Sequence, residues 1–295
     1  MDKLKIVYYG TPDFSADLLK KLVENKELPI EIIGVVTQPD KKVGRKQKLT
    51  PSPVKKVAGE LGIPLHPDLA TADLGLLFAY GEILPREVLE RPINGFWNVH
   101  RSLLPKYRGP SPIATPLLNG DTETGVTIIK MDFELDHGPI ISQQKSYIFP
   151  LFRRDQLTER LVELSAEMLG ELFGKYAGNI REVPSVEQNH SQATFTKKLT
   201  KQDGFISFSE LEKQIASNSS LLFNKFRGLY PWPGIWTIFP ISEISGNGDR
   251  VEKRLKITKM HLENGKLVIK KVQLEGKNEV DFEQFQSAYR ASFDG

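Results

Sequence analysis

Two short apolar runs near the N-terminus enclose a segment of helix length, and this order constrains the fold more than any other feature. Residues 4–10 (LKIVYYG) and 30–38 (IEIIGVVTQ) have the length and composition of buried parallel strands. Between them, apolar side chains from Phe14 to Leu22 recur on one face of a helix. A strand, a helix and a strand in this order predict a right-handed crossover unit in an α/β domain. The first turn reads GTPDF rather than GxGxxG, so no nicotinamide-binding fingerprint is expected.

The same reading continues along the chain and predicts two domains. Further strands are expected, together with a helix that starts at the Pro-Ser-Pro of 51–53, a Lys- and Gly-rich loop at 39–50 and a long amphipathic helix at 153–178. Beyond about Gly178 the periodicity ends, and strand-like runs follow a single helix expected at 209–228. We therefore expect an α/β domain at 1–180, a linker at 181–198 and a small β-rich domain at 199–295.

Composition excludes several classes of protein. The 295 residues include no cysteine, which rules out disulfides, thiolate zinc sites and cysteine nucleophiles. No apolar run approaches the roughly 18–20 residues of a membrane span, and no signal peptide is recognisable, so a cytoplasmic location is expected. The formal net charge of +3 favours a polyanionic partner only weakly. More specific is the run of basic residues between Asp40 and Lys56, although a solvated surface would also explain it.

Three polar residues are candidates for a site. Asn98 and His100 are two positions apart on a predicted strand, so their side chains point to one face. Asp136 lies in a loop just after another strand, and ligands bind beyond the carboxyl ends of strands in open α/β sheets. Taken singly, each is more often a structural residue than a catalytic one. His137 competes with His100 as a base, whereas His66, His190 and His261 have no polar company comparable to that of His100 and His137 and are interpreted as structural.

Two motifs decide between these interpretations. NVHRSLLPKYRGPSPI at 98–113, followed by LDHGPII at 135–141, resembles the folate-dependent formyltransferases. The resemblance implies that Asn98, His100 and Asp136 are the catalytic residues. It also implies that the SLLP loop shapes the entrance where two substrates meet, through Ser102, Leu103, Leu104 and Pro105.

This chemistry suits the residue types. When an amine attacks a formyl carbon, a tetrahedral oxyanion forms, and the Asn98 amide and His100 imidazole are donors that can stabilise it. A histidine also shuttles protons near neutral pH, and a carboxylate such as Asp136 orients it, favours its charged form or acts through a water.

Further motifs resemble the methionyl-tRNA formyltransferases within that family. They are GTPDF (10–14), VVTQPD (35–40), GRKQKLTPSPVK (44–55), AYGEILP (79–85), FTKKLTKQDGFISF (195–208) and YPWPGIW (230–236). The resemblance implies a Rossmann-like formyltransferase domain followed by an OB-like β-barrel that binds tRNA. It also implies 10-formyltetrahydrofolate as formyl donor, initiator methionyl-tRNA as acceptor, no metal and a monomer.

The resemblance further assigns residues to the two substrates. The folate pocket would be lined partly by Ala79, Tyr80, Gly81, Ile83 and Leu84. The basic loop would contact the acceptor end of the tRNA, as expected of side chains that pair with phosphates. Its residues are Lys41, Lys42, Arg45, Lys46 and Lys48.

Three positions depart from the family pattern. Arg101 stands where the family usually has proline, and a cation beside His100 would disfavour its protonated form if the two side chains approach. Phe133 replaces a small or polar residue, either as a harmless surface aromatic or as a cover for the cofactor mouth. The connection from His66 to Leu76 is short, where a helix is usual, which predicts a bare loop or a local change of strand order.

Three alternative functions use the same residues. The first transfers a formyl group to another amine, as in glycinamide ribonucleotide or nucleotide-sugar formyltransferases. The second hydrolyses formyltetrahydrofolate, with water in place of the amine. The third is a tRNA-binding module without activity, which only Arg101 favours.

Overall fold

The computed structural model describes residues 3–44, 46–217, 220–244, 250–264 and 266–289. The chain forms two compact units. Unit 1 contains 1–112, 123–147 and 158–197; unit 2 contains 113–122, 148–157 and 198–295. Two short segments that the sequence analysis placed in the first domain therefore pack with the C-terminal residues. Arg45 lies outside the described residues.

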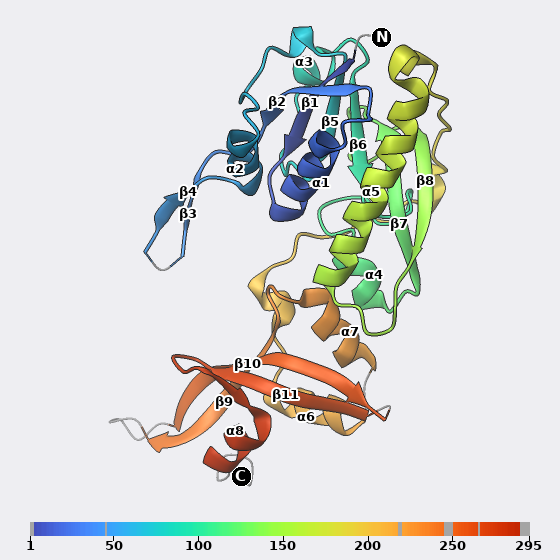
Figure 1. Ribbon diagram of the computed structural model, residues 1–295. Coiled ribbons are helices and arrows are strands. Elements are labelled where there is room, and N and C mark those ends of the chain that lie inside the picture. The colour runs from blue at the N-terminus through green and yellow to red at the C-terminus, as the bar shows by residue number, and fades with distance from the viewer. Residues whose placement is uncertain (1–2, 45, 218–219, 245–249, 265, 290–295) are drawn as a thin grey trace. The chain divides into compact units, whose positions relative to one another are not determined.

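Unit 1 is built on a six-stranded sheet in the order β2-β1-β5-β6-β7-β8 (Figure 1). The first four strands are parallel, and β7 and β8 continue the sheet antiparallel. The strands are β1 (Leu4–Gly10), β2 (Ile30–Val36), β5 (Leu74–Phe78), β6 (Phe96–His100), β7 (Glu123–Lys130) and β8 (Ile140–Tyr147). The predicted α/β domain with a parallel crossover is confirmed.

Different elements cover the two faces of this sheet. One face packs against α1 (Asp13–Glu24) and α5 (Arg154–Tyr176), where Trp97 of β6 stacks on Phe173 of α5. The opposite face carries Val7, Tyr9 and Phe96 and packs against the short elements η1 (Leu69–Thr71) and α3 (Arg86–Leu89). Because side chains alternate along a strand, Asn98 and His100 share the second face with Phe96.

Local sequence signals explain where the helices of this unit begin and end. The hydroxyl of Ser52 accepts a hydrogen bond from Lys55 N, which caps α2 (Pro53–Glu60) with proline in its first turn. In the first turn of α1, Ser15 Oγ donates to Phe78 O and contacts the hydroxyl of Tyr8. A Cβ on Gly10 would lie 1.9 Å from Ser15 Oγ, so only glycine fits there. Ser15, directly after the GTPDF turn, therefore ties the start of α1 to β1 and β5.

The 39–50 segment is a hairpin rather than the expected loop. Strands β3 (Lys41–Val43) and β4 (Lys48–Thr50) pair antiparallel, and Figure 1 shows them extending away from the sheet of unit 1. The short connection before β5 contains the 3-10 turn η1, and the order of the parallel strands is regular through it.

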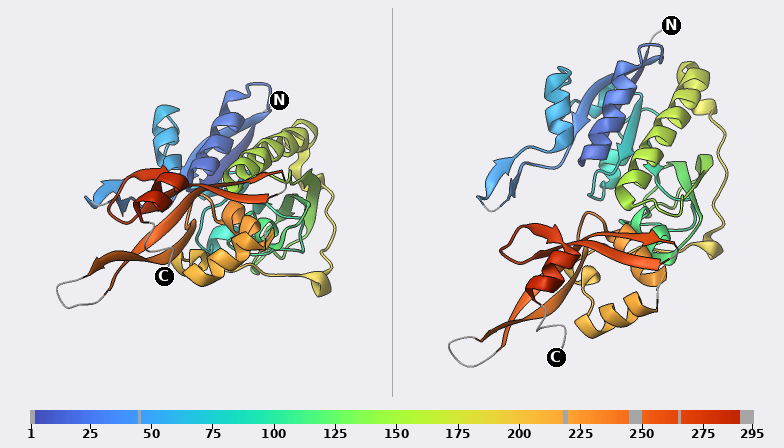
Figure 2. Two further views of the ribbon diagram at one scale, coloured as in Figure 1. Left: turned by 90° about the horizontal axis from the view of Figure 1, so that it is seen from below. Right: turned by 60° about the horizontal axis from the view of Figure 1, so that its bottom comes forward.

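Unit 2 contains a four-stranded antiparallel sheet in the order β12-β11-β10-β9, seen from two further directions in Figure 2. Its strands are β9 (Ile235–Ile244), β10 (Arg250–Glu263), β11 (Lys266–Leu274) and β12 (Glu279–Asp281). The antiparallel C-terminal sheet is as predicted. A core of aliphatic and aromatic side chains, including Leu222, Phe239 and Ile257, packs between sheet and helices.

The helices that lie wholly in unit 2 come from two of its three stretches of chain. They are α4 (Ala114–Asn119), α6 (Phe208–Ala216), α7 (Ser220–Leu229) and α8 (Phe282–Ala288). Gly120 ends α4 in the left-handed conformation, as the sequence indicates. The single helix expected at 209–228 is divided into α6 and α7. Three 3-10 turns lie between α5 and α6: η2 (Ala177–Glu182), η3 (His190–Gln192) and η4 (Lys201–Gly204).

Candidate active site

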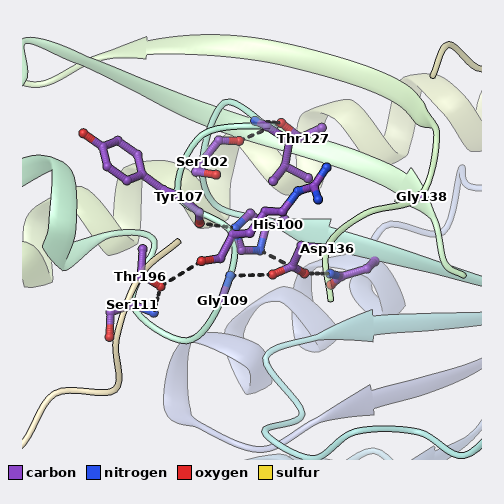
Figure 3. A network of polar contacts seen from close by, with 12 residues as sticks. His100, Ser102, Tyr107, Gly109, Ser111, Thr127, Asp136, Gly138 and Thr196 are labelled. Carbon is purple, nitrogen blue, oxygen red and sulfur yellow. Dashed lines mark hydrogen bonds and ion pairs between the residues drawn. The ribbon is translucent and has the colours of Figure 1, made fainter. Parts of the chain in front are cut away.

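The three predicted catalytic residues lie together at the carboxyl end of β6. Asn98 Nδ2 donates a hydrogen bond of 2.8 Å to Asp136 Oδ1, and His100 Nδ1 is 3.4 Å from the same oxygen. Asp136 comes from the loop between β7 and β8 (Figure 3). All three side chains are buried or nearly so. A compact polar group thus lies at the edge of the sheet where the sequence predicts it.

The other carboxylate oxygen of Asp136 is held by the backbone of a different loop. Gly109 N donates a hydrogen bond of 2.7 Å to Asp136 Oδ2. The carboxylate therefore accepts from an amide side chain at one oxygen and from a main-chain amide at the other. Gly109 has φ +103, which favours glycine and brings its backbone close to the carboxylate.

The imidazole of His100 is oriented at both nitrogens. Nε2 is 2.9 Å from the carbonyl oxygen of Tyr107, and Nδ1 faces Asp136. A carbonyl oxygen only accepts, so Nε2 carries a hydrogen in this contact. A second proton, at Nδ1, would lie against a carboxylate oxygen. The ring is thus placed to hold and release a proton beside Asp136.

The predicted SLLP loop is held by one internal hydrogen bond and by three hydrogen bonds to β7 and β8. Ser102 Oγ donates to Lys106 O at 2.6 Å, and Thr127 Oγ1 donates to Ser102 O at 2.6 Å. Leu104 N donates to Thr127 Oγ1, and Gln143 Nε2 donates to Leu104 O. Ser102 and Leu104 are buried, whereas Leu103 and Pro105 are partly exposed beside the site. The loop borders the polar group, and the Ser102 hydroxyl is bound within the loop to Lys106 O.

The loop predicted to line the folate pocket follows β5, the parallel neighbour of β6. Ala79 (φ 55) and Gly81 (φ 88) have left-handed backbone, and Thr11 Oγ1 donates to Tyr80 O at 2.8 Å. The side chain of Ile83 is 89% exposed, whereas Leu84 packs on the core cluster of Val7 and Phe96. Burial, followed by the neighbouring Glu82, raises the pKa of Tyr80, so its phenol stays protonated at neutral pH.

Sequence reasoning missed several residues around Asp136. Gln188 Nε2 donates to Asp136 O and to Gly138 O, and Arg108 Nη2 donates to Gln188 Oε1. Thr196 Oγ1 bridges the same region, accepting from Ser111 N and donating to Arg108 O. Gln188 and Thr196 lie in the predicted linker, which in fact runs along unit 1 and binds its loops. No periodicity marks such residues, although Arg108 stands inside the quoted motif.

The alternative base His137 has a different environment. Its Nδ1 is 2.6 Å from Asp132 Oδ2 and its Nε2 is 3.9 Å from Glu134 Oε2, so both nitrogens contact carboxylates of its own loop. Its ring stacks on His190, with 3.9 Å between the ring centroids, and Arg108 Nη2 lies 2.9 Å from His190 Nδ1. The interpretation of His190 as a residue without comparable polar company is therefore wrong.

The two unusual residues of the motif both contact side chains outside the polar group. The Arg101 guanidinium lies 4.1 Å from the ring centroid of Phe14 and 5.0 Å from that of Phe78. It thus points to the α1 face of the sheet, opposite to His100, and the expected effect on His100 loses its geometric basis. Phe133 is 57% exposed, and the guanidinium of Arg86 lies over its ring at 4.4 Å.

The basic hairpin presents its lysines to solvent. Lys41, Lys42, Lys46 and Lys48 are all exposed, and Asp40, the acid of this segment, pairs with Lys55 at 2.7 Å. Lys42 lies opposite Leu49, and Val43 lies opposite Lys48. Since directly opposed residues share a face, each face of the hairpin combines a lysine with an exposed aliphatic side chain.

Comparisons with known proteins agree with this geometry. A family model described as formyl transferase matches residues 3–172. The chain is a formyltransferase, as the α/β sheet and the polar group at the carboxyl end of β6 also indicate.

Two curated relatives refine this assignment. A methionyl-tRNA formyltransferase of Kosmotoga olearia is 42% identical over 248 residues, which cover 79% of this chain and 76% of the relative. One of Thermotoga maritima is 36% identical over 305 residues, covering 95% of this chain and 93% of the relative. The chain belongs to the methionyl-tRNA formyltransferase family.

A solved structure extends the likeness in fold. The N-formyltransferase of Helicobacter canadensis, in complex with folinic acid and dTDP-3-aminofucose, superposes with a TM-score of 0.60 at 16% identity. The match covers 93% of this chain and 95% of that protein. Among the described residues, none of the helices is both long and apolar enough to span a membrane.

Proposed function

We propose that this formyltransferase moves the formyl group of 10-formyltetrahydrofolate to the amino group of methionyl initiator tRNA in the cytoplasm. The observation that carries the proposal is the shared carboxylate of Asp136. It contacts Asn98 Nδ2 at 2.8 Å, Gly109 N at 2.7 Å and His100 Nδ1 at 3.4 Å. A proton-handling histidine and an amide donor are thereby held side by side.

The reaction exchanges one bond and one proton. The amine nitrogen bonds to the formyl carbon, the bond from that carbon to N10 breaks, the amine loses one proton and N10 gains one. His100, with Asp136 beside Nδ1, accepts and returns the proton. Asn98 Nδ2 has two hydrogens, so it can donate to the developing oxyanion while it holds Asp136.

The loop 79–85 suits a pterin-bearing co-substrate. Ala79 and Gly81 have left-handed backbone, Ile83 supplies exposed apolar surface, and the ring of Tyr80 is half-buried. Because β5 and β6 are parallel neighbours, this loop lies at the same sheet edge as His100. The folate would supply the activated formyl group. The chain would bind and orient the two substrates and move the proton.

The basic hairpin supports a tRNA acceptor. Lysines pair with phosphates without reading sequence, and the exposed Val43 and Leu49 offer apolar contact to sugars or bases of an unpaired end. Lys41, Lys42, Lys46 and Lys48 are the proposed contacts from the described part of the hairpin. Arg45, proposed from the resemblance, lies outside it.

One assay tests the proposal. Purified protein and 10-formyltetrahydrofolate are incubated with methionyl initiator tRNA, methionyl elongator tRNA or a nucleotide-linked amino sugar, and formylated product and free formate are both measured. We expect product with the initiator tRNA in preference to the elongator. His100→Ala should lose turnover by roughly 10²–10⁴-fold and still bind tRNA.

Each rival predicts a different outcome. A sugar enzyme would formylate the amino sugar and bind tRNA with little salt dependence. A hydrolase would release formate without any tRNA. A module without activity would bind tRNA and form no product. Any of these results would overturn the proposal.

A further inference from the structure

Gln188 contacts the loop of Asp136 from the segment that follows α5. Its side chain is buried, with 5% exposed. Nε2 donates to two main-chain carbonyls, Asp136 O at 3.0 Å and Gly138 O at 2.8 Å. A single primary amide therefore bridges the chain on both sides of His137.

The bridged loop has a backbone that needs support. Asp136 has φ 51, in the left-handed region where residues other than glycine persist only when their surroundings hold them. Gly138 is packed so closely that a Cβ would lie 1.8 Å from Lys130 O. The two hydrogens of Gln188 Nε2 satisfy the carbonyls that flank this turn, so the turn and the Asp136 carboxylate are fixed together.

Arg108 determines which way the Gln188 amide points. Its Nη2 donates to Gln188 Oε1 at 2.7 Å, and its side chain is buried. Guanidinium groups only donate, so the amide oxygen must face Arg108 and the amide nitrogen must face the two carbonyls. Arg108 also directly precedes Gly109, whose N–H donates to the carboxylate oxygen Oδ2 of Asp136. The same short segment thus acts on the Asp136 loop through two routes.

We infer that Gln188 is a positioning residue for formyl transfer, which acts by holding the Asp136 loop while Arg108 orients its amide. The inference rests on the proposed function of the Asn98, His100 and Asp136 group. His100 Nδ1 and Asp136 Oδ1 are 3.4 Å apart. A small displacement of the loop would change this distance and with it the transfer of the proton at His100. Displacements of about 1 Å can reduce rates by about 10²-fold.

Gln188→Glu is the sharpest variant. Glutamate has the same length and still accepts from Arg108, but its carboxylate has no hydrogen to donate to the two carbonyls. We expect kcat to fall by about 10- to 100-fold, with the KM for folate and for tRNA nearly unchanged. Gln192→Glu makes the same charge change at an exposed position on the same segment and should keep the wild-type kcat.

Two further variants separate positioning from general stability. Gln188→Met removes the donors without adding charge, and it carries the test if Gln188→Glu does not fold. In the background of Asp136→Asn, Gln188→Glu should add little further loss, because the residue that it positions has already been changed. Losses that multiply, or KM values that rise with unchanged kcat, would overturn the inference.

The outcomes also distinguish the two proposals. Absence of formylation by both the wild-type protein and Gln192→Glu would reject the proposed function. Normal formylation by the wild-type protein, with both Gln188→Glu and Gln188→Met keeping the wild-type kcat, would reject only the role of Gln188.

Discussion

Asn98 and Asp136 are 38 positions apart in the chain, and Nδ2 of Asn98 donates a hydrogen bond of 2.8 Å to Oδ1 of Asp136. The same oxygen faces His100 Nδ1. One carboxylate oxygen is thus shared by the two polar side chains that β6 presents on one face. A change at Asp136 therefore disturbs the amide and the imidazole together.

Asp136→Asn tests this shared contact. Asparagine keeps the shape but replaces a carboxylate oxygen with a donor or with a neutral acceptor, so one contact to Asn98, Gly109 or His100 is lost or weakened. We expect kcat to fall by roughly 10²–10⁴-fold, with little change in tRNA affinity. Single-turnover formylation measures the rate. Asp132→Asn, which alters the partner of His137, is the matched control; a larger loss at Asp132 would point to His137 as the base.

Local rules placed this group, whereas the resemblance to the folate-dependent formyltransferases singled out its three residues as catalytic. Alternation along a strand put Asn98 and His100 on one face, and the carboxyl edge of the sheet is where loops converge. Gln188 was not predictable in that way, because it lies in a stretch without periodicity and its partners are main-chain carbonyls about 50 positions away. Such contacts depend on the tertiary path of the chain and leave no pattern in composition.

Arg101 offers a prediction about stability rather than rate. Its guanidinium lies over Phe14 and Phe78, and such contacts contribute about 0.5–2 kcal/mol. Arg101→Met should lower the melting temperature by about 2–4 °C per kcal/mol lost while kcat stays close to wild type. Calorimetry and the formylation assay check both parts. A marked change in kcat at unchanged stability would instead support an electrostatic effect of Arg101 on His100.

Two glycines predict opposite effects of the same substitution. At Gly138 a Cβ would lie 1.8 Å from Lys130 O, so Gly138→Ala should cost about 1–3 kcal/mol and reduce kcat by moving Asp136. At Gly174, inside α5, a Cβ meets nothing within 4 Å. Gly174→Ala should therefore stabilise the protein by up to about 1 kcal/mol. Urea unfolding of both variants compares them directly, and equal stability would contradict the packing argument.

Composition did not predict the secondary structure of the basic hairpin. Lys and Gly content indicated a loop at 39–50, whereas Lys41–Val43 and Lys48–Thr50 pair as strands. Each strand has only three residues, too few for alternation to stand out from a charged loop. The sequence analysis left open that these lysines form only a solvated surface, and the hairpin is compatible with that explanation. A binding measurement is therefore needed to tell a solvated surface from a tRNA-binding one.

That measurement is the salt dependence of tRNA binding. The double variant Lys42→Gln and Lys48→Gln removes one exposed lysine from each face of the hairpin and leaves Leu49 and Val43 in place. If both lysines bind phosphates, the slope of log K against log salt concentration should become shallower by roughly 1.5, because each neutralised phosphate contributes about 0.7–0.9. The KM for tRNA should rise while the KM for folate is unchanged. Lys20→Gln with Lys26→Gln, two exposed lysines outside the hairpin, controls for net charge. An equal loss of slope in the control would mean that overall charge, rather than the hairpin, attracts the tRNA.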